Sequence, residues 1–416
     1  MKKFISCALL VLGASMMMAP TYPIDGYDRT GIRRLAHLQM IQEGSMQGTA
    51  NLSGALRAMD EIKLNLVEGT LKDMTLPEVD PELQKKLNQL FPNMHESYSI
   101  ALLDITPGRP VRFAERQPQR QFQPGSVGKL AIAAGLFCEL ESIYPESFED
   151  RISLLKDKKV RAGVWAIPNE HTVPFFDPST KQFFKRVLQE QDVFSLYEWV
   201  DHMLSVSSNG AASVLWRELI LMRAFGQQYP DLSESQANEY FKNTPKTELS
   251  QIAMSIVNDP LRSLGIGEDE WRLGSLFTRG GKSMVPGLGG STGTPYGMMK
   301  FLIAVEQGKL VDPSSSLELK RLMYMTDRRI RYASAKVLSD AAVYFKSGSL
   351  YKCQPEEGYE CRKYMGNVNN YMNSVAIVEH PDGTKYLVTL MSNVLKKNSS
   401  NDHFALATHI DRLIRS

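Results

Sequence analysis

The stretch from Phe122 to Cys138 places a hydrophobic helix directly behind a break in the chain. Pro124 and Gly125 interrupt regular structure, and an apolar run rich in Leu and Ala follows them, which is typical of a loop that enters a helix. Ser126 falls in the first turn and Lys129 three residues later, so both side chains share one helical face with Cβ atoms about 5–6 Å apart. A desolvated lysine can remove the proton of a neighbouring serine hydroxyl. The alternative is an N-cap serine followed by a solvated lysine.

Two further polar clusters adjoin apolar elements later in the chain. Ser-Ser-Asn at 207–209 lies between two helical patterns, and Lys-Ser-Gly at 346–348 follows an apolar run at 341–345. With Ser126 and Lys129, these clusters resemble, in the same order, the S-x-x-K, S-D-N and K-T-G motifs of class A β-lactamases and penicillin-binding proteins. The resemblance covers residues 96–416. It implies an α+β fold of three layers, α/β/α, in which an antiparallel sheet adjoins a helical subdomain.

The resemblance also implies a role for each of these residues. Ser126 would attack a carbonyl carbon and become acylated, with Lys129 as its base. Ser207 would relay a proton to the leaving nitrogen, and Asn209 would bind the substrate's side-chain amide and orient Lys129. Lys346 and Ser347 would bind the substrate carboxylate. The backbone amides of Ser126 and Ser349 would form the oxyanion hole. Gly348 would let the strand approach a ligand closely.

Each cluster taken alone also has a purely structural explanation. Ser207 and Asn209 could cap the helix that begins near Ala211, and the Lys-Ser-Gly triplet could be an exposed strand end. A Gly-x-Ser-x-Gly string at 289–293 matches the nucleophile elbow of another hydrolase class, but a broken loop precedes it instead of the strand that this elbow requires. The seven histidines show no zinc-binding spacing. The resemblance implies neither a metal nor an organic cofactor.

The sequence departs from the class A pattern in three respects. Ser208 stands where that pattern has Asp, and Ser347 replaces Thr but keeps a hydroxyl. The deacylating glutamate of class A enzymes lies in an E-x-x-L-N string, and no such string occurs between Trp216 and Tyr296. Glu270, in the run Glu-Asp-Glu-Trp-Arg-Leu at 268–273, is the best candidate, and a solvated acidic turn is the alternative. Without such a base, water would attack the acyl-enzyme slowly.

The N-terminus predicts export. Two lysines precede an apolar run at 4–18, followed by small residues, as in a secretory signal peptide. We therefore divide the chain into a signal peptide at 1–19, a helical extension at 20–95 and the main domain at 96–416. Cys353 and Cys361, on either side of a polar step, could form a disulfide in an oxidising periplasmic or extracellular space. Contact with a membrane would require an uncleaved signal.

Local patterns predict the main elements. Strands are expected at 99–104 and 111–114, and a hairpin at 373–380 and 385–391 across Pro-Asp-Gly. Helices are expected at 32–43, 55–67, 81–90, 193–204, 211–225, 296–307, 315–325 and 403–414. Residues 157–180 are expected to form a loop, and residues 226–295 form a long, polar and partly Gly-rich region to which no helix or strand is assigned.

Composition bears on the partners of the chain. Its 416 residues are 43% hydrophobic, with a net charge of +2, so nothing indicates binding to nucleic acid; protein partners stay unknown at this point. The main hypothesis is an exported serine hydrolase that forms an acyl-enzyme with β-lactams or related amides. The alternatives are a penicillin-binding D,D-peptidase acting on peptidoglycan stem peptides and a catalytically silent scaffold of the same fold.

Overall fold

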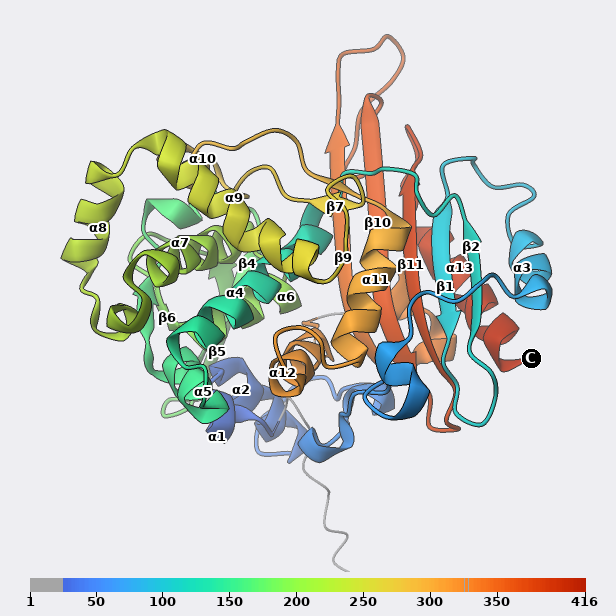
Figure 1. The fold of residues 1–416 in the computed structure, drawn as a ribbon, viewed down its shortest axis with the longest axis horizontal. Helices are drawn as coiled ribbons and strands as arrows, with labels where there is room; N and C mark the ends of the chain where they lie inside the picture. The colour runs from blue at the N-terminus through green and yellow to red at the C-terminus, as the bar shows by residue number, and fades with distance from the viewer. Residues whose placement is uncertain (1–24, 325, 328) are drawn as a thin grey trace, which may run out of the picture.

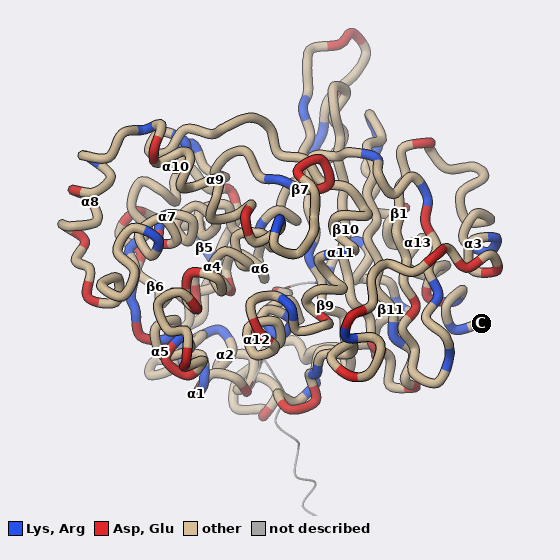
Figure 2. The backbone as a smooth tube through the Cα atoms, viewed as in Figure 1, with Lys and Arg blue, Asp and Glu red and all other residues tan. Residues whose placement is uncertain are grey.

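The computed structural model describes residues 25–416 apart from residues 325 and 328. The expected signal peptide at 1–19 lies outside the described residues, so it remains a prediction. Within the described part, no helix is both long enough and apolar enough to cross a membrane. Acidic and basic residues are both scattered over the described backbone (Figure 2).

One half of the described structure is an antiparallel sheet of five strands in the order β2-β1-β11-β10-β9 (Figure 1). The first strand of the chain pairs with the last one, since Leu102 faces Val388 in the register of β1 and β11. The edge strand β9 has one side free of sheet partners, and this side faces the helical half. The strands are β1 (Ser99–Asp104), β2 (Arg112–Arg116), β9 (Ala342–Lys352), β10 (Asn369–Glu379) and β11 (Lys385–Asn393).

Successive side chains of a strand point to opposite faces of the sheet, and apolar side chains lie on both faces. Helices therefore cover both faces. In β1, Ile100 and Leu102 belong to a core with helices α3 (Pro81–Asn88) and α13 (Ser400–Arg415). Ala101 and Leu103 point to the opposite face and join the larger core, to which α11 (Pro295–Glu306) and α12 (Pro313–Tyr324) contribute. A strand whose side chains are buried on both faces of the sheet needs a packed layer on each side, and here both layers are helical. The predicted three-layer α/β/α arrangement is confirmed.

The other half is mostly helical and lies beside the free edge of β9 (Figure 1). Its centre is α4, which is buried along nearly its whole length and packs against α7 and α9. The α helices of this half are α4 (Lys129–Ile143), α5 (Phe148–Asp157), α6 (Leu196–Ser205), α7 (Asn209–Phe225), α8 (Glu234–Asn243), α9 (Lys246–Ser263) and α10 (Arg279–Met284). Short antiparallel pairs are formed by β3 (Lys159–Arg161) with β6 (Val193–Ser195), β4 (Thr172–Asp177) with β5 (Gln182–Val187), and β7 (Trp271–Arg272) with β8 (Thr292–Gly293).

The N-terminal segment at 25–74 runs beneath both halves (Figure 1). It begins with α1 (Tyr27–Thr30) and α2 (Arg33–Gln42). On the helical half, the buried Arg34 guanidinium pairs with Asp201 of α6 at 2.5 Å. On the sheet half, Asn65 Nδ2 donates to Glu379 of β10 at 2.7 Å. The expected helical extension is therefore a segment that fastens the two halves together.

Three regions differ from the sequence-based expectation. Residues 55–67 contain only short 3-10 turns, because their backbone donates to other elements, as Arg57 N does to the Tyr324 hydroxyl at 2.7 Å. The region at 157–180, expected to be a loop, contributes β3 and β4. The region at 226–295 contains α9, whose buried Leu249, Ala253 and Val257 recur at helical spacing despite polar neighbours.

Candidate active site

Ser126 lies where a short 3-10 helix, η4 (Gly125–Gly128), runs directly into α4. Its hydroxyl therefore stands at the N-terminal end of a buried helix. From β10 of the sheet, Asn373 Nδ2 donates to the carbonyl oxygen of Pro124 at 3.1 Å, which fixes the approach to the turn. The nucleophile expected from the sequence is thus held between the two halves of the molecule.

The amine of Lys129 is the centre of a hydrogen-bonded cluster. Nζ lies 2.9 Å from Ser126 Oγ, and it donates to the carbonyl oxygen of Ser207 and to Asn209 Oδ1, both at 2.7 Å. The residue is 0% exposed. Burial, and then the nearby charge of Lys346, hold the pKa of Lys129 well below its ordinary value, because both disfavour the ammonium form. A neutral amine in this place has a lone pair with which to accept the Ser126 proton.

The turn before α7 brings Ser207 and Asn209 to that amine. Ser207 has a φ of 61°, in the left-handed region that non-glycine residues seldom adopt. Its neighbour Ser208 is the N-cap of α7, and the Ser208 hydroxyl accepts a hydrogen bond from Ala211 N at 3.1 Å. The structure thus gives the capping role to Ser208 and leaves Ser207 and Asn209 free to face Lys129. It also explains how serine replaces aspartate at 208, since both residues cap well.

Strand β9 supplies the third cluster along its free edge. Lys346 is 2% exposed, and its Nζ donates to Ser207 Oγ at 2.8 Å. Burial, followed by the charge of Arg331, lowers the pKa of Lys346 to about 7. Gly348 meets the nucleophile turn directly: a Cβ at this position would lie 2.2 Å from the Pro124 carbonyl oxygen and 3.0 Å from Ser126 N. The glycine is required by this close approach, whereas the sequence suggested an approach to a ligand.

The two amides expected to form the oxyanion hole lie on backbone segments that touch. A Cβ on Gly125 would stand 2.8 Å from Ser349 N, so the amides of Ser126 and Ser349 both belong to the contact between η4 and β9. Ser347 follows Lys346 on the same strand and is 9% exposed. The structure therefore brings together all the expected residues of the three motifs.

Glu270 does not join this cluster. Both of its carboxylate oxygens accept hydrogen bonds from Lys300 of α11, at 2.8 and 2.9 Å, and one also accepts from Gly267 N at 2.7 Å. Among the described residues, no carboxylate pairs with Lys129 or Lys346. The segment that follows Glu270 instead places apolar groups there: the Phe277 ring lies 4.9 Å from Lys129 Nζ, and a Leu273 methyl packs at Gly128.

Arg331 is a residue of the site that the sequence analysis missed. Its guanidinium donates to the carbonyl oxygen of Gly348 at 2.9 Å and to Ser349 Oγ at 3.1 Å, and it lies over the Tyr364 ring at 5.1 Å. Arg331 and Tyr364 both have positive φ, 53° and 62°, and such strain concentrates at functional sites. No local pattern marks either residue, because their importance comes from contacts across the fold.

The β9–β10 hairpin extends beyond the rest of the sheet (Figure 1). Cys353 and Cys361 form a disulfide in its connecting loop, with a Cα–Cα distance of 6.1 Å. The loop then returns through Lys363 and Tyr364 toward β10. The disulfide therefore closes a loop whose return segment reaches Arg331, at the edge of the site.

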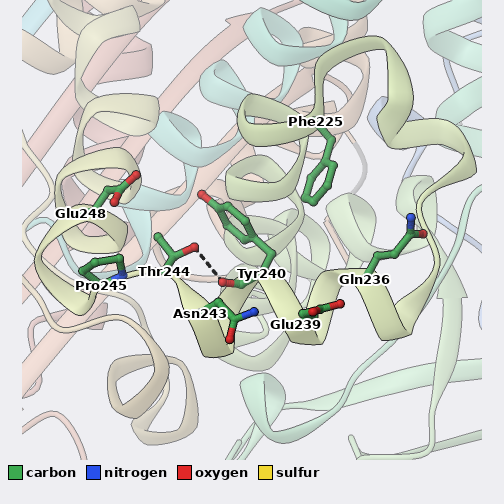
Figure 3. Close-up of a pocket in the computed structure, with 8 residues that line it drawn as sticks. All are labelled: Phe225, Gln236, Glu239, Tyr240, Asn243, Thr244, Pro245 and Glu248. Atoms are coloured by element: carbon green, nitrogen blue, oxygen red, sulfur yellow. Dashed lines mark hydrogen bonds between the residues drawn. The ribbon is translucent and has the colours of Figure 1, made fainter.

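A hollow is lined by residues of α8 and the start of α9 (Figure 3), and α8 lies at the outer end of the helical half (Figure 1). It has a volume of about 480 Å³, and its aromatic side is formed by Phe225 and Tyr240, whose rings lie edge to face with centroids 5.5 Å apart. Its two carboxylates, Glu239 and Glu248, are exposed. The hollow contains none of the residues expected from the sequence, so the cluster around Ser126 is the candidate active site.

The chain belongs to the Beta-lactamase enzyme family, whose model matches residues 82–410. The match begins at the start of α3 and ends within α13, so it includes the whole sheet and the helical half. No curated protein matches the chain in sequence. Membership in the serine β-lactamase and penicillin-binding protein superfamily, expected from the three motifs, is confirmed.

Solved structures of the same fold are distant in sequence. A β-lactamase from Chitinophaga pinensis is 15% identical with a TM-score of 0.51, over 80% of this chain and 97% of that one. A class A β-lactamase from Bacteroides cellulosilyticus is 15% identical with a TM-score of 0.50, over 81% and 98%. The TLA-3 extended-spectrum β-lactamase is 13% identical with a TM-score of 0.50, over 80% and 97%. These similarities show the fold.

Proposed function

We propose that this protein is an exported serine hydrolase that forms an acyl-enzyme on Ser126 with β-lactams or related amides. The observation that carries the proposal is the buried Lys129 amine, 2.9 Å from Ser126 Oγ, with a lowered pKa. A serine hydroxyl becomes a useful nucleophile only beside a base. A neutral lysine with no paired carboxylate is such a base.

The hydrogen bonds of Lys129 suit this task. A neutral amine has two N–H groups and one lone pair, and the carbonyl oxygen of Ser207 and Asn209 Oδ1, both at 2.7 Å, take the two N–H groups. The lone pair is then left for the Ser126 hydroxyl. As Ser126 Oγ attacks the amide carbon, its proton passes to Lys129, and the amides of Ser126 and Ser349 stabilise the negative oxygen.

Ser207 supplies the path for the proton to the leaving nitrogen. Its hydroxyl lies 3.4 Å from Lys129 Nζ and 2.8 Å from Lys346 Nζ. The proton held by Lys129 can pass through Ser207 Oγ to the departing amine as the C–N bond breaks. In its charged form, Lys346 attracts the substrate carboxylate, with Ser347 and Arg331 beside it. Water then attacks the ester carbon and releases Ser126.

One observation favours a second function, that of a penicillin-binding D,D-peptidase on peptidoglycan stem peptides. Glu270 pairs with Lys300, and the apolar side chains of Leu273 and Phe277 lie against the Ser126–Lys129 turn. An acyl-enzyme formed from a β-lactam would then persist. A peptide substrate releases its leaving amine on acylation, whereas the amine of an opened β-lactam ring stays attached to the acyl group, so water reaches the ester formed from a peptide more easily.

Intact mass spectrometry over time, with and without excess benzylpenicillin, tests both functions. A transient adduct at Ser126 with consumption of the antibiotic supports the hydrolase, and a lasting adduct supports the peptidase. Ser126→Ala and Lys129→Ala variants should form no adduct, while the exposed and distant His409→Ala variant should behave as wild type. Absence of any adduct on the wild type would contradict the proposal and favour the silent scaffold.

Export is part of the proposal and has its own test. The apolar N-terminal run and the Cys353–Cys361 disulfide support it, because disulfides persist in oxidising compartments. Expression of the full chain followed by cell fractionation should recover a shortened protein outside the cytoplasm. Recovery of the full-length chain in the cytoplasm would contradict export.

A further inference from the structure

Arg331 contacts the peptide group that carries one amide of the expected oxyanion hole. Its guanidinium donates to the carbonyl oxygen of Gly348 at 2.9 Å and to Ser349 Oγ at 3.1 Å. The Gly348 carbonyl and the Ser349 N–H belong to one planar peptide group, in which they point in opposite directions because the bond is trans. Arg331 therefore holds one end of the peptide whose other end is expected to stabilise the negative oxygen.

This hydrogen bond strengthens the Ser349 N–H as a donor. A cation that donates to a carbonyl oxygen draws electron density from the amide nitrogen through the resonance of the peptide, and linked hydrogen bonds strengthen one another in a protein interior. The bond also fixes the plane of the peptide, and with it the direction of the N–H. Both effects grow with the negative charge on the reacting oxygen, so they favour the transition state over the bound substrate.

The guanidinium of Arg331 is buried without a carboxylate. Arg331 is 7% exposed, and within the described part of the chain no carboxylate forms an ion pair with it. Burial lowers the pKa of Arg331, and Tyr364 counteracts this shift. The Tyr364 ring lies over the guanidinium, with 5.1 Å between Cζ and the ring centroid, and such a contact stabilises a cation by about 0.5–2 kcal/mol. Tyr364 therefore supports the charge in its place against β9.

The loop that carries Tyr364 is itself fixed to the sheet. The disulfide closes this loop. Two residues after Tyr364, the N–H of Gly366 donates to Asn370 Oδ1 at 3.2 Å, and Asn370 is buried in β10. Tyr351 of β9 packs edge to face against the Tyr364 ring, with centroids 5.9 Å apart. The ring is thus held over Arg331 from both strands of the hairpin.

We propose that Tyr364 is a positioning residue: its ring holds the Arg331 guanidinium against the 348–349 peptide and so sets the direction and donor strength of the Ser349 N–H in the oxyanion hole. The inference rests on the proposed function, because it concerns acylation of Ser126. It gives the extended β9–β10 hairpin a part in the reaction. Direct contact of Arg331 with the substrate carboxylate is a different role, and the test separates the two.

The test compares benzylpenicillin with its methyl ester, which keeps the β-lactam ring and lacks the carboxylate charge. The second-order rate constant for acylation of Ser126 is measured by intact mass. Removal of a whole oxyanion donor costs on the order of 100–1000-fold, so weakening one donor in Tyr364→Leu should slow both compounds about 10-fold. Tyr364→Phe keeps the ring face and should stay within about twofold of the wild type. Tyr240→Leu, in the hollow lined by α8, should leave both rates unchanged.

A double-mutant cycle shows whether Tyr364 acts through Arg331. Arg331→Met removes the donor to Gly348 and should slow acylation at least as much as Tyr364→Leu. Adding Tyr364→Leu to Arg331→Met should then have no further effect, because the ring has no guanidinium left to hold. If Tyr364 only stabilised the loop, the two effects would multiply.

Each outcome bears on the inference. Slowing confined to benzylpenicillin would mean that the pair binds the carboxylate, and unchanged rates, multiplying effects or an equal loss in Tyr364→Phe would also overturn the inference, while the proposed function stands. If the wild type is acylated by neither compound, the proposed function fails, and the inference with it. If the ester reacts too slowly to measure, the double-mutant cycle with benzylpenicillin decides. Thermal melting identifies an unfolded Tyr364→Leu, and the comparison of both compounds on Arg331→Met then decides.

Discussion

Lys346 Nζ donates a hydrogen bond of 2.8 Å to Ser207 Oγ, and this contact joins the edge strand of the sheet to the turn that begins α7. The two residues come from different halves of the molecule. Through Ser207 Oγ, the two buried lysines of the site lie on either side of one hydroxyl. Their protonation states are therefore linked, and the pH dependence of acylation follows from the link.

We expect a bell-shaped pH profile for the second-order acylation rate constant. At acid pH, Lys129 takes up a proton and can no longer accept the proton of Ser126, so the rate falls as pH decreases through the lowered pKa of Lys129. At alkaline pH, Lys346 loses the charge that attracts the substrate carboxylate, so the rate falls as pH rises through about 7. Stopped-flow or quenched mass measurements from about pH 5 to about pH 10 report these free-enzyme values.

The Lys346→Arg variant separates the two limbs of this profile. Its guanidinium stays charged throughout the range, so the alkaline fall should disappear while the acid limb remains. A wild-type rate that does not change between neutral and alkaline pH would contradict the assignment of that limb to Lys346.

Gly348→Ala should disable the site without unfolding the protein. The added methyl group would lie 2.2 Å from the Pro124 carbonyl oxygen, so β9 and the Ser126 turn must move apart. A misplacement of about 1 Å can cost on the order of 100-fold in rate, and we expect a loss of this size in acylation. Gly290→Ala is the matched control, because its methyl group would meet no atom within 4 Å. Equal acylation rates for both variants would refute the close approach.

Ser208→Ala should lower both stability and acylation. Loss of an N-cap costs about 1 kcal/mol, and here the cap holds the turn that carries Ser207 and Asn209. Ser233→Ala removes the equivalent cap of α8, which lies away from the site, and should lower stability by a similar amount with acylation unchanged. Denaturant unfolding and adduct formation measure the two effects. Loss of acylation in both variants would show that destabilisation alone is responsible.

Glu270→Gln should leave the lifetime of the acyl-enzyme unchanged within about twofold, because the carboxylate is bound by Lys300 and contacts neither Ser126 nor Lys129. Its cost should appear as stability, about 1 kcal/mol for a partly exposed ion pair. Lys300→Met should have the same cost. A much longer adduct lifetime in Glu270→Gln alone would restore this residue as the deacylating base.

The sequence predicted the family and the layered fold because the signals that carry them are local. Ser126 follows a Pro-Gly break, and the hairpin around Pro381 and Gly383 has an alternating pattern on both sides, so turn chemistry and periodicity marked these elements. The prediction for 55–67 was wrong because the partners of this segment, among them Tyr324, lie far away along the chain. The helix α9 was overlooked because of its polar residues and Pro260, although its buried positions recur at helical spacing.

The residues of the site likewise divide into those marked by local sequence motifs and those placed by long-range contacts. Ser126, Lys129, Ser207, Asn209 and Lys346 stand in short motifs, so their joint placement could be expected. The ion pair of Glu270 with Lys300, the hydrogen bond of Arg331 to Gly348 and the contact of Arg331 with Tyr364 depend on segments that meet only in the folded chain. None has a signature within its own neighbourhood. Long-range contacts of this kind are what a single sequence leaves open.

The pairing of β1 with β11 has a consequence for the biosynthesis of the protein. β1 ends at Asp104 and faces Tyr386 of β11, so one edge of this strand stays without its partner until nearly the whole chain has left the ribosome. Asn65 likewise waits for Glu379. Because contacts between distant segments close late, a growing chain keeps unpaired strand edges throughout its synthesis. Truncation near the C-terminus should therefore yield a chain that aggregates rather than a smaller folded domain.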